Sequence, residues 1–207
     1  MQLAVGECGV GSEIERMMDT QSDEMPAALA DDALASAARR DPDAFAELYR
    51  RYVDRVFRYL LARLGDSQLA QDLTAQTFLA ALEGIDGYAG RGDLAAWLVA
   101  IARHKVLDHF RRSRPSLPLD QAQSLPDPRP GPDDLAADRL RLEQVARVLQ
   151  TLPSERAEAF ALRMFSDLSV AEVGRVMGKS EAAVKMLVHR AVRDLRERLI
   201  LTGEADL

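Results

Sequence analysis

Residues 168–198 read LSVAEVGRVMGKSEAAVKMLVHRAVRDLRER, and two amphipathic patterns meet in them at a short turn. In the first pattern, apolar residues recur at helical spacing after Ser169, which stands where an N-cap side chain accepts an orphan amide. Gly178 ends this pattern, and Ser180 offers a second N-cap. Apolar residues then follow at intervals of four, three and four positions: Val184, Val188, Ala191 and Leu195. Two helices joined by about three residues, the second of them basic, predict a helix-turn-helix, whose second helix enters the DNA major groove.

The outward face of the second helix has the residue types of a DNA-reading surface. Small residues near its start let the backbone approach base edges, and its basic residues can neutralise phosphates or reach guanine acceptors. The alternative is that this face is exposed to solvent and carries only ion pairs within the helix. The mixture of basic and acidic residues from Arg193 to Arg198 is typical of such a face. The residues that we expect to bind duplex DNA are Ser180, Ala183, Lys185, Met186, His189, Arg190 and Arg193.

The composition favours an all-α protein of two small domains. Of the 207 residues, 47% are apolar and 5% aromatic, and alternating β-branched runs are absent. We find no apolar run that could span a membrane and no signal peptide, so we expect a cytoplasmic protein without membrane insertion. The single cysteine, Cys8, can form neither an internal disulfide nor a metal site.

The net charge of −6 is distributed unevenly along the chain. Residues 1–38 carry eight acids and one base, whereas residues 39–114 carry thirteen bases and ten acids. Residues 115–150 have a net charge of −2, and residues 151–207 are neutral. Nucleic-acid binding must therefore come from local basic patches rather than from bulk charge.

Residues 1–36 are expected to form a mostly disordered acidic tail, because their helical periodicity is weak. Order is predicted from Asp41-Pro42, an N-cap followed by a proline in the first turn of a long core helix that ends at Gly65. Asp66 or Ser67 caps a second helix, which has one buried and one polar face, and Asp93 caps a third.

Residues 84–92, GIDGYAGRG, place four glycines in nine positions, which predicts a mobile loop. The loop lacks the ending of a phosphate-binding P-loop, so nucleotide hydrolysis is not expected. Five basic residues and one acidic residue lie between Arg103 and Arg114. The basic residues either interact favourably with the dipole at the C-terminal end of the helix or bind a row of nucleic-acid phosphates. Tyr88 and Phe110 are candidates for stacking on unpaired bases.

We expect neither a metal site nor catalysis. His104 and Asp108 share a helix face, but His109 lies about a hundred degrees away from them. The sequence shows no nucleophile–base pair. The predictions therefore include no cofactor, no metal and no small-molecule substrate.

The domain boundary is predicted at a proline-rich linker, residues 115–135. Six of the nine prolines lie in this region, which makes the segment extended and semi-rigid. Helical pattern resumes after it, is broken at Leu152-Pro153-Ser154, and continues into the helix-turn-helix. The second domain is placed at residues 136–202, and the linker leaves its orientation open.

Taken together, the two halves resemble bacterial sigma factors of the sigma-70 family, in their short extracytoplasmic-function (ECF) form. The resemblance covers about residues 40–112 and 136–200. It rests on AQDLTAQTFLAAL, LAAWLVAIARHKVLDHFRRSR and LPSERAEAFALRMFSDLSVAEVGRVMGKSEAAVKMLVHRA, which begin at residues 70, 94 and 152. It implies a region 2 helical bundle at residues 37–114 and a region 4 helix-turn-helix domain at 136–202.

The resemblance also implies partners. Core RNA polymerase would dock on Asp72, Thr74, Gln76 and Phe78. A flipped base of the minus-ten element would be captured by Tyr88 and Arg91, and phosphates of the opened strand would be held by Arg103, Lys105, Arg111 and Arg112. The minus-thirty-five element would be read by Lys185, Met186, His189 and Arg190. An anti-sigma factor would cover the polymerase-binding faces of both domains.

The chain departs from the family pattern in two places. Ala75-Gln76 replaces the usual Gln-Glu pair, which removes a carboxylate from the docking face and predicts weaker core binding. Between Ala182 and Leu187, the second helix of the helix-turn-helix lacks polar residues that the family pattern has there. Two alternatives stay open from the sequence: a stand-alone helix-turn-helix regulator, and a helical interaction protein that binds a partner through the face from Asp72 to Glu83 without DNA.

Overall fold

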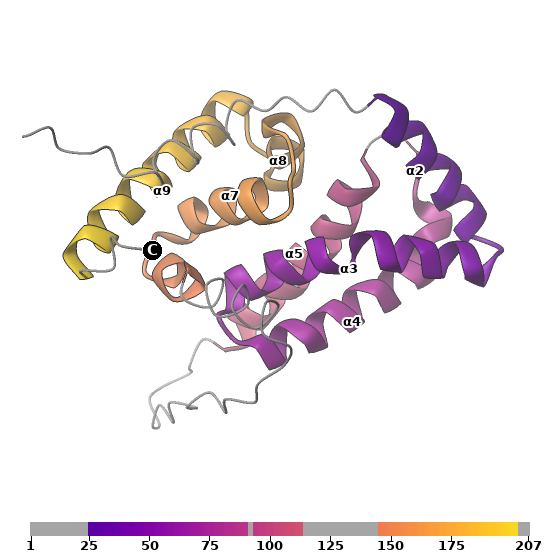
Figure 1. The fold of residues 1–207 in the computed structure, drawn as a ribbon, viewed down its shortest axis with the longest axis horizontal. Coiled ribbons are helices and arrows are strands. Elements are labelled where there is room, and N and C mark those ends of the chain that lie inside the picture. Colours follow the sequence, from indigo (N-terminus) through magenta and orange to yellow (C-terminus); the bar gives the residue numbers. More distant parts are fainter. Residues whose placement is uncertain (1–24, 91–92, 114–144, 203–207) are drawn as a thin grey trace, which may run out of the picture.

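The computed structural model describes residues 25–90, 93–113 and 145–202. These residues form helices and short connections, and no strand occurs among them. Figure 1 shows the arrangement, and residues 145–150 are also helical. The all-α prediction is confirmed. The named elements are α2 (Met25–Ala38), α3 (Pro42–Leu64), α4 (Ser67–Gly84), the 3-10 turn η1 (Ile85–Gly87), α5 (Leu94–Arg112), α7 (Ser154–Phe165), α8 (Val170–Met177) and α9 (Glu181–Thr202).

The ends of the helices in the first domain follow the local signals of the sequence. Asp41 caps α3 by accepting a hydrogen bond from the amide of Asp43 at 2.9 Å. The helix ends at Gly65, whose φ of 68° lies in the left-handed region that favours glycine. Asp66 caps α4 and Asp93 caps α5, each through its side-chain oxygen. These predicted caps are confirmed.

Helix α2 corrects the expectation of a mostly disordered tail over residues 1–36. Residues 25–36 belong to this helix, whereas residues 1–24 lie outside the described part of the chain. Its small side chains Ala35 and Ala38 are buried in the core. Asp31 accepts hydrogen bonds from Tyr52 and, at 2.7 Å, from Arg51 of α3. Asp31, one of the eight acids of residues 1–38, therefore anchors α2 to α3.

Helices α3, α4 and α5 pack against one another and form the core of the first domain. Leu48, Val56 and Leu60 of α3 are fully buried, as are Leu98 and Val99 of α5. In the second domain, α9 packs on both α7 and α8. The stripe predicted for α9 is buried as expected: Val184, Val188, Ala191 and Leu195.

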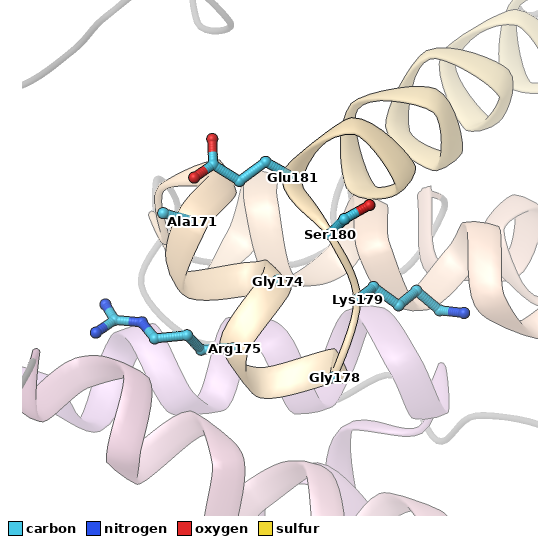
Figure 2. A pocket seen from close by; sticks show the side chains of 7 residues that line it. All are labelled: Ala171, Gly174, Arg175, Gly178, Lys179, Ser180 and Glu181. Atoms are coloured by element: carbon cyan, nitrogen blue, oxygen red, sulfur yellow. The ribbon is translucent and has the colours of Figure 1, made fainter.

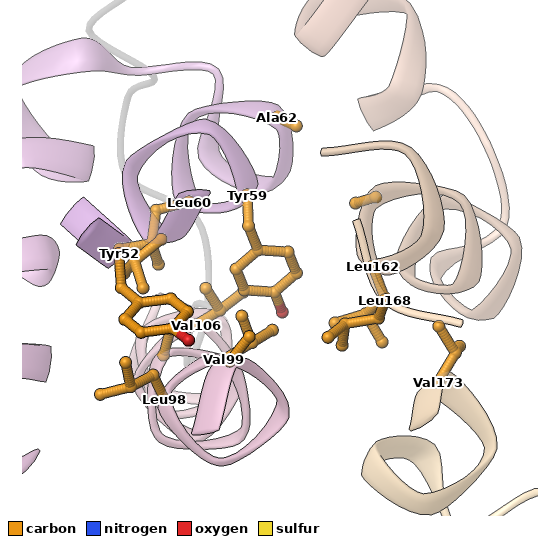
Figure 3. Close-up of a cluster of buried hydrophobic side chains, with 14 of the residues drawn as sticks. Tyr52, Tyr59, Leu60, Ala62, Leu98, Val99, Val106, Leu162, Leu168 and Val173 are labelled. Carbon is orange, nitrogen blue, oxygen red and sulfur yellow. The ribbon is translucent and has the colours of Figure 1, made fainter. Parts of the chain in front are cut away.

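The two domains also pack against each other, through α3 with α7 and α5 with α8. Figure 3 shows Tyr59, Val99 and Val106 of the first domain beside Leu162, Leu168 and Val173 of the second. These side chains belong to one continuous buried cluster. The sequence left the domain placement open, and the structure has a closed arrangement. The expected linker, residues 115–135, lies outside the described residues.

In the described part of the chain, none of the helices combines the length and apolar character needed to cross a bilayer.

Candidate nucleic-acid interface

The helix-turn-helix is built by local capping at both of its helices. At the start of α8, Ser169 and Glu172 form a reciprocal capping box, with hydrogen bonds of 3.2 and 2.7 Å. The helix ends at Gly178, which has a φ of 66°. The hydroxyl of Ser180 then accepts a hydrogen bond from the amide of Ala183 at 3.3 Å. The three-residue turn and both predicted N-caps are confirmed.

Close backbone contact holds the turn against α8. The amide of Lys179 donates to the carbonyl of Gly174 at 2.9 Å. A Cβ at Gly174 would lie 2.8 Å from the carbonyl oxygen of Lys179, closer than real Cβ atoms approach such an atom. Gly174 therefore permits the approach of the turn to α8. Figure 2 shows this region as a hollow lined by Ala171, Gly174, Arg175, Gly178, Lys179, Ser180 and Glu181.

The residues expected to read duplex DNA share the outward face of α9. Met186 is 51% exposed, and Ala183 is half-buried. Arg193 lies 3.8 Å from Glu197 in an exposed ion pair, so part of its charge is balanced within the helix. The remaining members of the set are exposed: Ser180, Lys185, His189 and Arg190. The structure therefore brings the upstream set together on one accessible surface.

The minus-ten set is less accessible than the sequence suggested. Tyr88 is only 6% exposed, and its hydroxyl donates to Asp32 of α2 at 3.0 Å. Its ring packs against Trp97, with 5.3 Å between ring centroids. In this structure Ile85 and Tyr88 anchor the loop in the core, and stacking of Tyr88 on an unpaired base stays a prediction. Arg91 lies outside the described residues.

The basic end of α5 divides into two parts. Arg111 is exposed and pairs with Asp108 at 2.6 Å, and Arg112 is exposed as well. Lys105 is half-buried. Arg103 instead points to the second domain, where its Nε lies 3.4 Å from a carboxylate oxygen of Glu158. One face of the Phe110 ring is occupied by the guanidinium of Arg63, 5.6 Å from the ring centroid.

Helix α4 carries the expected polymerase-docking residues on two different faces. Asp72 and Gln76 are exposed. Thr74 and Phe78 are buried, Thr74 bonding the carbonyl of Ala70 and Phe78 packing on Tyr49. Thr74 and Phe78 therefore occupy core positions in this structure, and their part in docking stays a prediction. The surface beside Asp72 and Gln76 includes apolar side chains that the sequence analysis did not single out: Tyr49, Leu79 and Leu82, the last two 58% and 47% exposed.

Two family models match the chain: Sigma-70 region 2 over residues 48–115, and Sigma-70, region 4 over residues 142–195. The ECF RNA polymerase sigma factor SigC of Mycobacterium tuberculosis (strain CDC 1551 / Oshkosh) is 33% identical over 171 residues, covering 83% of this chain and 89% of SigC. The chain belongs to the ECF family of RNA polymerase sigma factors. This membership decides against the stand-alone regulator and the DNA-independent interaction protein.

Further similarities extend the assignment. The ECF RNA polymerase sigma factor BldN of Streptomyces coelicolor is 41% identical over 162 residues, or 77% of this chain. That alignment covers 61% of BldN, so the chain matches less than two thirds of that relative. The solved structure of CnrH in complex with the cytosolic domain of CnrY has a TM-score of 0.66 and 26% identity, and the match covers 86% of this chain and 99% of CnrH.

In this sigma factor, a buried carboxylate joins the two domains. Glu158 of α7 is 4% exposed, and it accepts hydrogen bonds from the Tyr59 hydroxyl at 2.7 Å and from Arg63 Nε at 2.9 Å. Burial, and then the nearby Glu158 carboxylate, raises the pKa of Tyr59 well above its usual value. The phenol therefore stays protonated and acts as a donor. No local sequence pattern predicts this cluster, because Arg63 and Tyr59 lie 95 and 99 positions before Glu158.

A second polar contact joins α5 and α8 of the sigma factor. Asp93, the N-cap of α5, hydrogen-bonds to Glu172 of the α8 capping box. Burial, reinforced by this bond, raises the pKa of Asp93 to about 6. Burial alone would raise the pKa of Glu172 too, but hydrogen bonds from Asp93 and Ser169 lower it. Below about pH 6 the two carboxyl groups therefore share one proton, which resides on Asp93.

Among the described residues, no group of three or more histidine, cysteine, aspartate or glutamate side chains could hold a metal ion.

Proposed function

We propose that this sigma factor binds core RNA polymerase, directs it to promoters and helps to open the duplex, without catalysis of its own. The observation that supports this most directly is the combination of two surfaces in one chain. The second domain presents the exposed, partly basic face of α9 on a helix-turn-helix, and the first domain presents the exposed face of α4. We also infer that the protein acts in the cytoplasm, where polymerase and DNA are found.

The upstream element is read by α9 in this proposal. Lys185 and Arg190 carry the positive charge of the exposed face, and His189 lies beside them. Arginine can bond guanine in a bidentate manner, whereas lysine can also hold a phosphate. Met186 is apolar and 51% exposed, which suits contact with a thymine methyl group.

The docking surface for core polymerase is the exposed face of α4. Asp72, Gln76 and Leu79 follow at helical spacing and share this face. Leu82 and Tyr49 extend it with apolar area, which marks protein-binding surfaces more reliably than polar residues alone do. Helix α4 packs on α3 and α5, and Figure 1 shows it on the side of α3 away from α9. Docking and duplex reading therefore use opposite sides of the molecule.

A protein inhibitor is a further part of the proposal. CnrH was solved in complex with the cytosolic domain of CnrY, and it matches this chain across both domains. We infer that an anti-sigma factor binds this protein as well. The exposed leucines of α4 offer such a partner the same apolar surface that core polymerase uses.

Binding to purified core polymerase tests the docking surface. A variant with both Asp72→Arg and Gln76→Arg is expected to bind core at least tenfold more weakly than the wild type. Asp54→Arg, an exposed change on α3, serves as the control and is expected to bind normally. Equal core binding by the wild type and the double variant would overturn the assignment of this face.

A further inference from the structure

The loop that follows α4 has few contacts of its own to define its shape. Of its described part, residues 85–90, only Ile85 and Tyr88 are buried, whereas Ala89 and Gly90 are exposed. Gly90 has a φ of 62°, in the left-handed region that favours glycine. The exposed end of the loop therefore depends on contacts with other elements for a single conformation.

Helix α2 and the residue after it supply these contacts. Asp32 of α2 accepts a hydrogen bond from the Tyr88 hydroxyl at 3.0 Å, and the guanidinium of Arg39 donates to the Tyr88 carbonyl. A Cβ at Gly90 would lie 3.8 Å from the carboxyl carbon of Asp32, so this carboxylate also lies against the loop backbone. Burial, and then the bond to Asp32, raises the pKa of Tyr88, so its phenol stays protonated and donates. Both the side chain and the main chain of Tyr88 are therefore held from α2.

Helix α2 is itself anchored well enough to support the loop. It packs on α3 and also contacts α5, and its Ala35 and Ala38 are buried. Asp31 accepts a 2.7 Å hydrogen bond from Arg51 of α3, and the Asp31 side chain is only 15% exposed. The adjacent acids Asp31 and Asp32 therefore bind different elements, Asp31 the helix α3 and Asp32 the loop. Together they connect the loop to the core helix.

These contacts bear on binding because a preformed loop loses less conformational freedom when it takes up a ligand. The apparent affinity of a site is reduced by the fraction of molecules in which the site has the competent shape. A hydrogen bond from a phenol to a carboxylate is stronger than one between neutral groups. The bond between Tyr88 and Asp32, at a residue that is 6% exposed, therefore keeps most molecules in one loop conformation.

We propose that Asp32 and Arg39 are positioning residues for the minus-ten element, which hold residues 85–90 in the shape that receives an unpaired base. This inference rests on the proposed function, because it assigns the loop to promoter DNA. Neither residue needs to touch the DNA. A carboxylate repels phosphates, so Asp32 can favour DNA binding only through the loop that it holds.

The test uses the full-length sigma factor assembled with core polymerase, and a single-stranded oligonucleotide that carries the promoter's minus-ten sequence. Asp32→Ala is expected to weaken binding of this oligonucleotide by about fivefold or more. Asp32→Asn loses the same charge, but its amide oxygen still accepts from Tyr88, so its affinity should stay within about twofold of the wild type. Loss of the negative charge alone would instead strengthen binding in both variants. Arg39→Gln should weaken binding more than Arg40→Gln, which removes the same charge from the adjacent exposed residue.

A second variant separates positioning from a general loss of stability. Tyr88→Phe keeps the ring that packs on Trp97 but removes the donor, so adding Asp32→Ala should weaken binding no further. Affinities for core polymerase and for the upstream duplex should stay at the wild-type level in all of these variants.

Equal binding by Asp32→Ala and Asp32→Asn, or additive losses with Tyr88→Phe, overturns positioning by Asp32. A parallel loss of core and duplex binding overturns it as well, because the change is then not confined to the loop. If the wild type binds the minus-ten sequence no better than a scrambled one, the proposed function fails together with this inference. If the wild type prefers the minus-ten sequence and Asp32→Ala binds it equally well, only the inference fails.

Discussion

Glu158 of α7 and Arg63 of α3 form a hydrogen-bonded ion pair of 2.9 Å, although each side chain is only 5% exposed. Removing one member of such a pair leaves an uncompensated charge in the interface, whereas removing both charges does not. The cost of the first change is therefore much larger than the net contribution of the pair.

The variant Arg63→Met is expected to lower the free energy of unfolding by about 3 kcal/mol, because it leaves the buried Glu158 carboxylate with only the longer contact to Arg103, 3.4 Å away, to balance its charge. Adding Glu158→Gln should recover more than half of this loss, since an amide oxygen still accepts from Tyr59 and no charge remains buried. Urea unfolding of the wild type, both single variants and the double variant measures the coupling. Strictly additive losses would show that the two residues do not act as a pair.

Stability is expected to depend on pH through Asp93. Its pKa of about 6 means that the folded protein keeps a proton that the unfolded chain releases near pH 4. The free energy of unfolding should therefore fall as pH rises from about 4 to about 6, and stay level above that. The lowered pKa of Glu172 acts in the opposite direction, by reducing stability once pH falls below about 4.5.

Asp93→Asn tests this shared proton. Asparagine is an equally good N-cap and can donate to Glu172 without a titratable proton. We expect the variant to be more stable than the wild type at pH 7.5 and to lose the fall in stability between pH 4.5 and 6. Urea midpoints measured across this range decide the matter. If the free energy of unfolding of the asparagine variant falls over this pH range as it does in the wild type, another group is responsible for the decrease.

Gly174→Ala is expected to destabilise the helix-turn-helix by about 1–3 kcal/mol, because its Cβ meets the backbone oxygen of Lys179. Gly178→Asn is the matched control: the position is open, and asparagine tolerates a positive φ. The melting temperature and the affinity for a minus-thirty-five duplex should both fall in Gly174→Ala and change little in Gly178→Asn. Equal effects of the two substitutions would contradict the close-approach argument.

Arg190→Ala is expected to weaken binding of the upstream duplex by about 1–3 kcal/mol if the arginine reads a base. Lys185→Ala, if the lysine holds a phosphate, should weaken binding to all sequences and reduce the salt slope by about one. Arg50→Ala on α3 removes a charge from a distant, exposed ion pair and serves as the control. Fluorescence anisotropy at two salt concentrations distinguishes these roles. Unaltered affinity in Arg190→Ala would remove that residue from the interface.

The parts of the fold that local chemistry determines could be predicted from the sequence. The caps Asp41, Asp66 and Ser169 act within three residues of themselves, so their patterns are visible in the chain. The buried stripe of α9 is visible for the same reason, because helical spacing determines which residues share a face.

Contacts between segments distant in the sequence could not be predicted from local patterns. Tyr88 looked accessible among glycines, yet α2, 56 positions earlier, supplies the aspartate that binds its hydroxyl. Glu158 looked like an ordinary helix surface residue and lies instead among the side chains of α3 and α5. Thr74 and Phe78 were matched to a motif without regard to the helix face on which they lie, and both are buried. In each case the deciding contact is non-local.

Run-off transcription with purified core polymerase tests the central claim most directly. Templates come from the region upstream of the gene that encodes this sigma factor, and core binding is assayed in parallel. We expect transcripts that need the sigma factor and disappear when Asp72→Arg and Gln76→Arg are combined, while Asp54→Arg supports normal transcription. If the wild type fails to bind core at micromolar concentration but still binds duplex DNA, it does not act as a sigma factor.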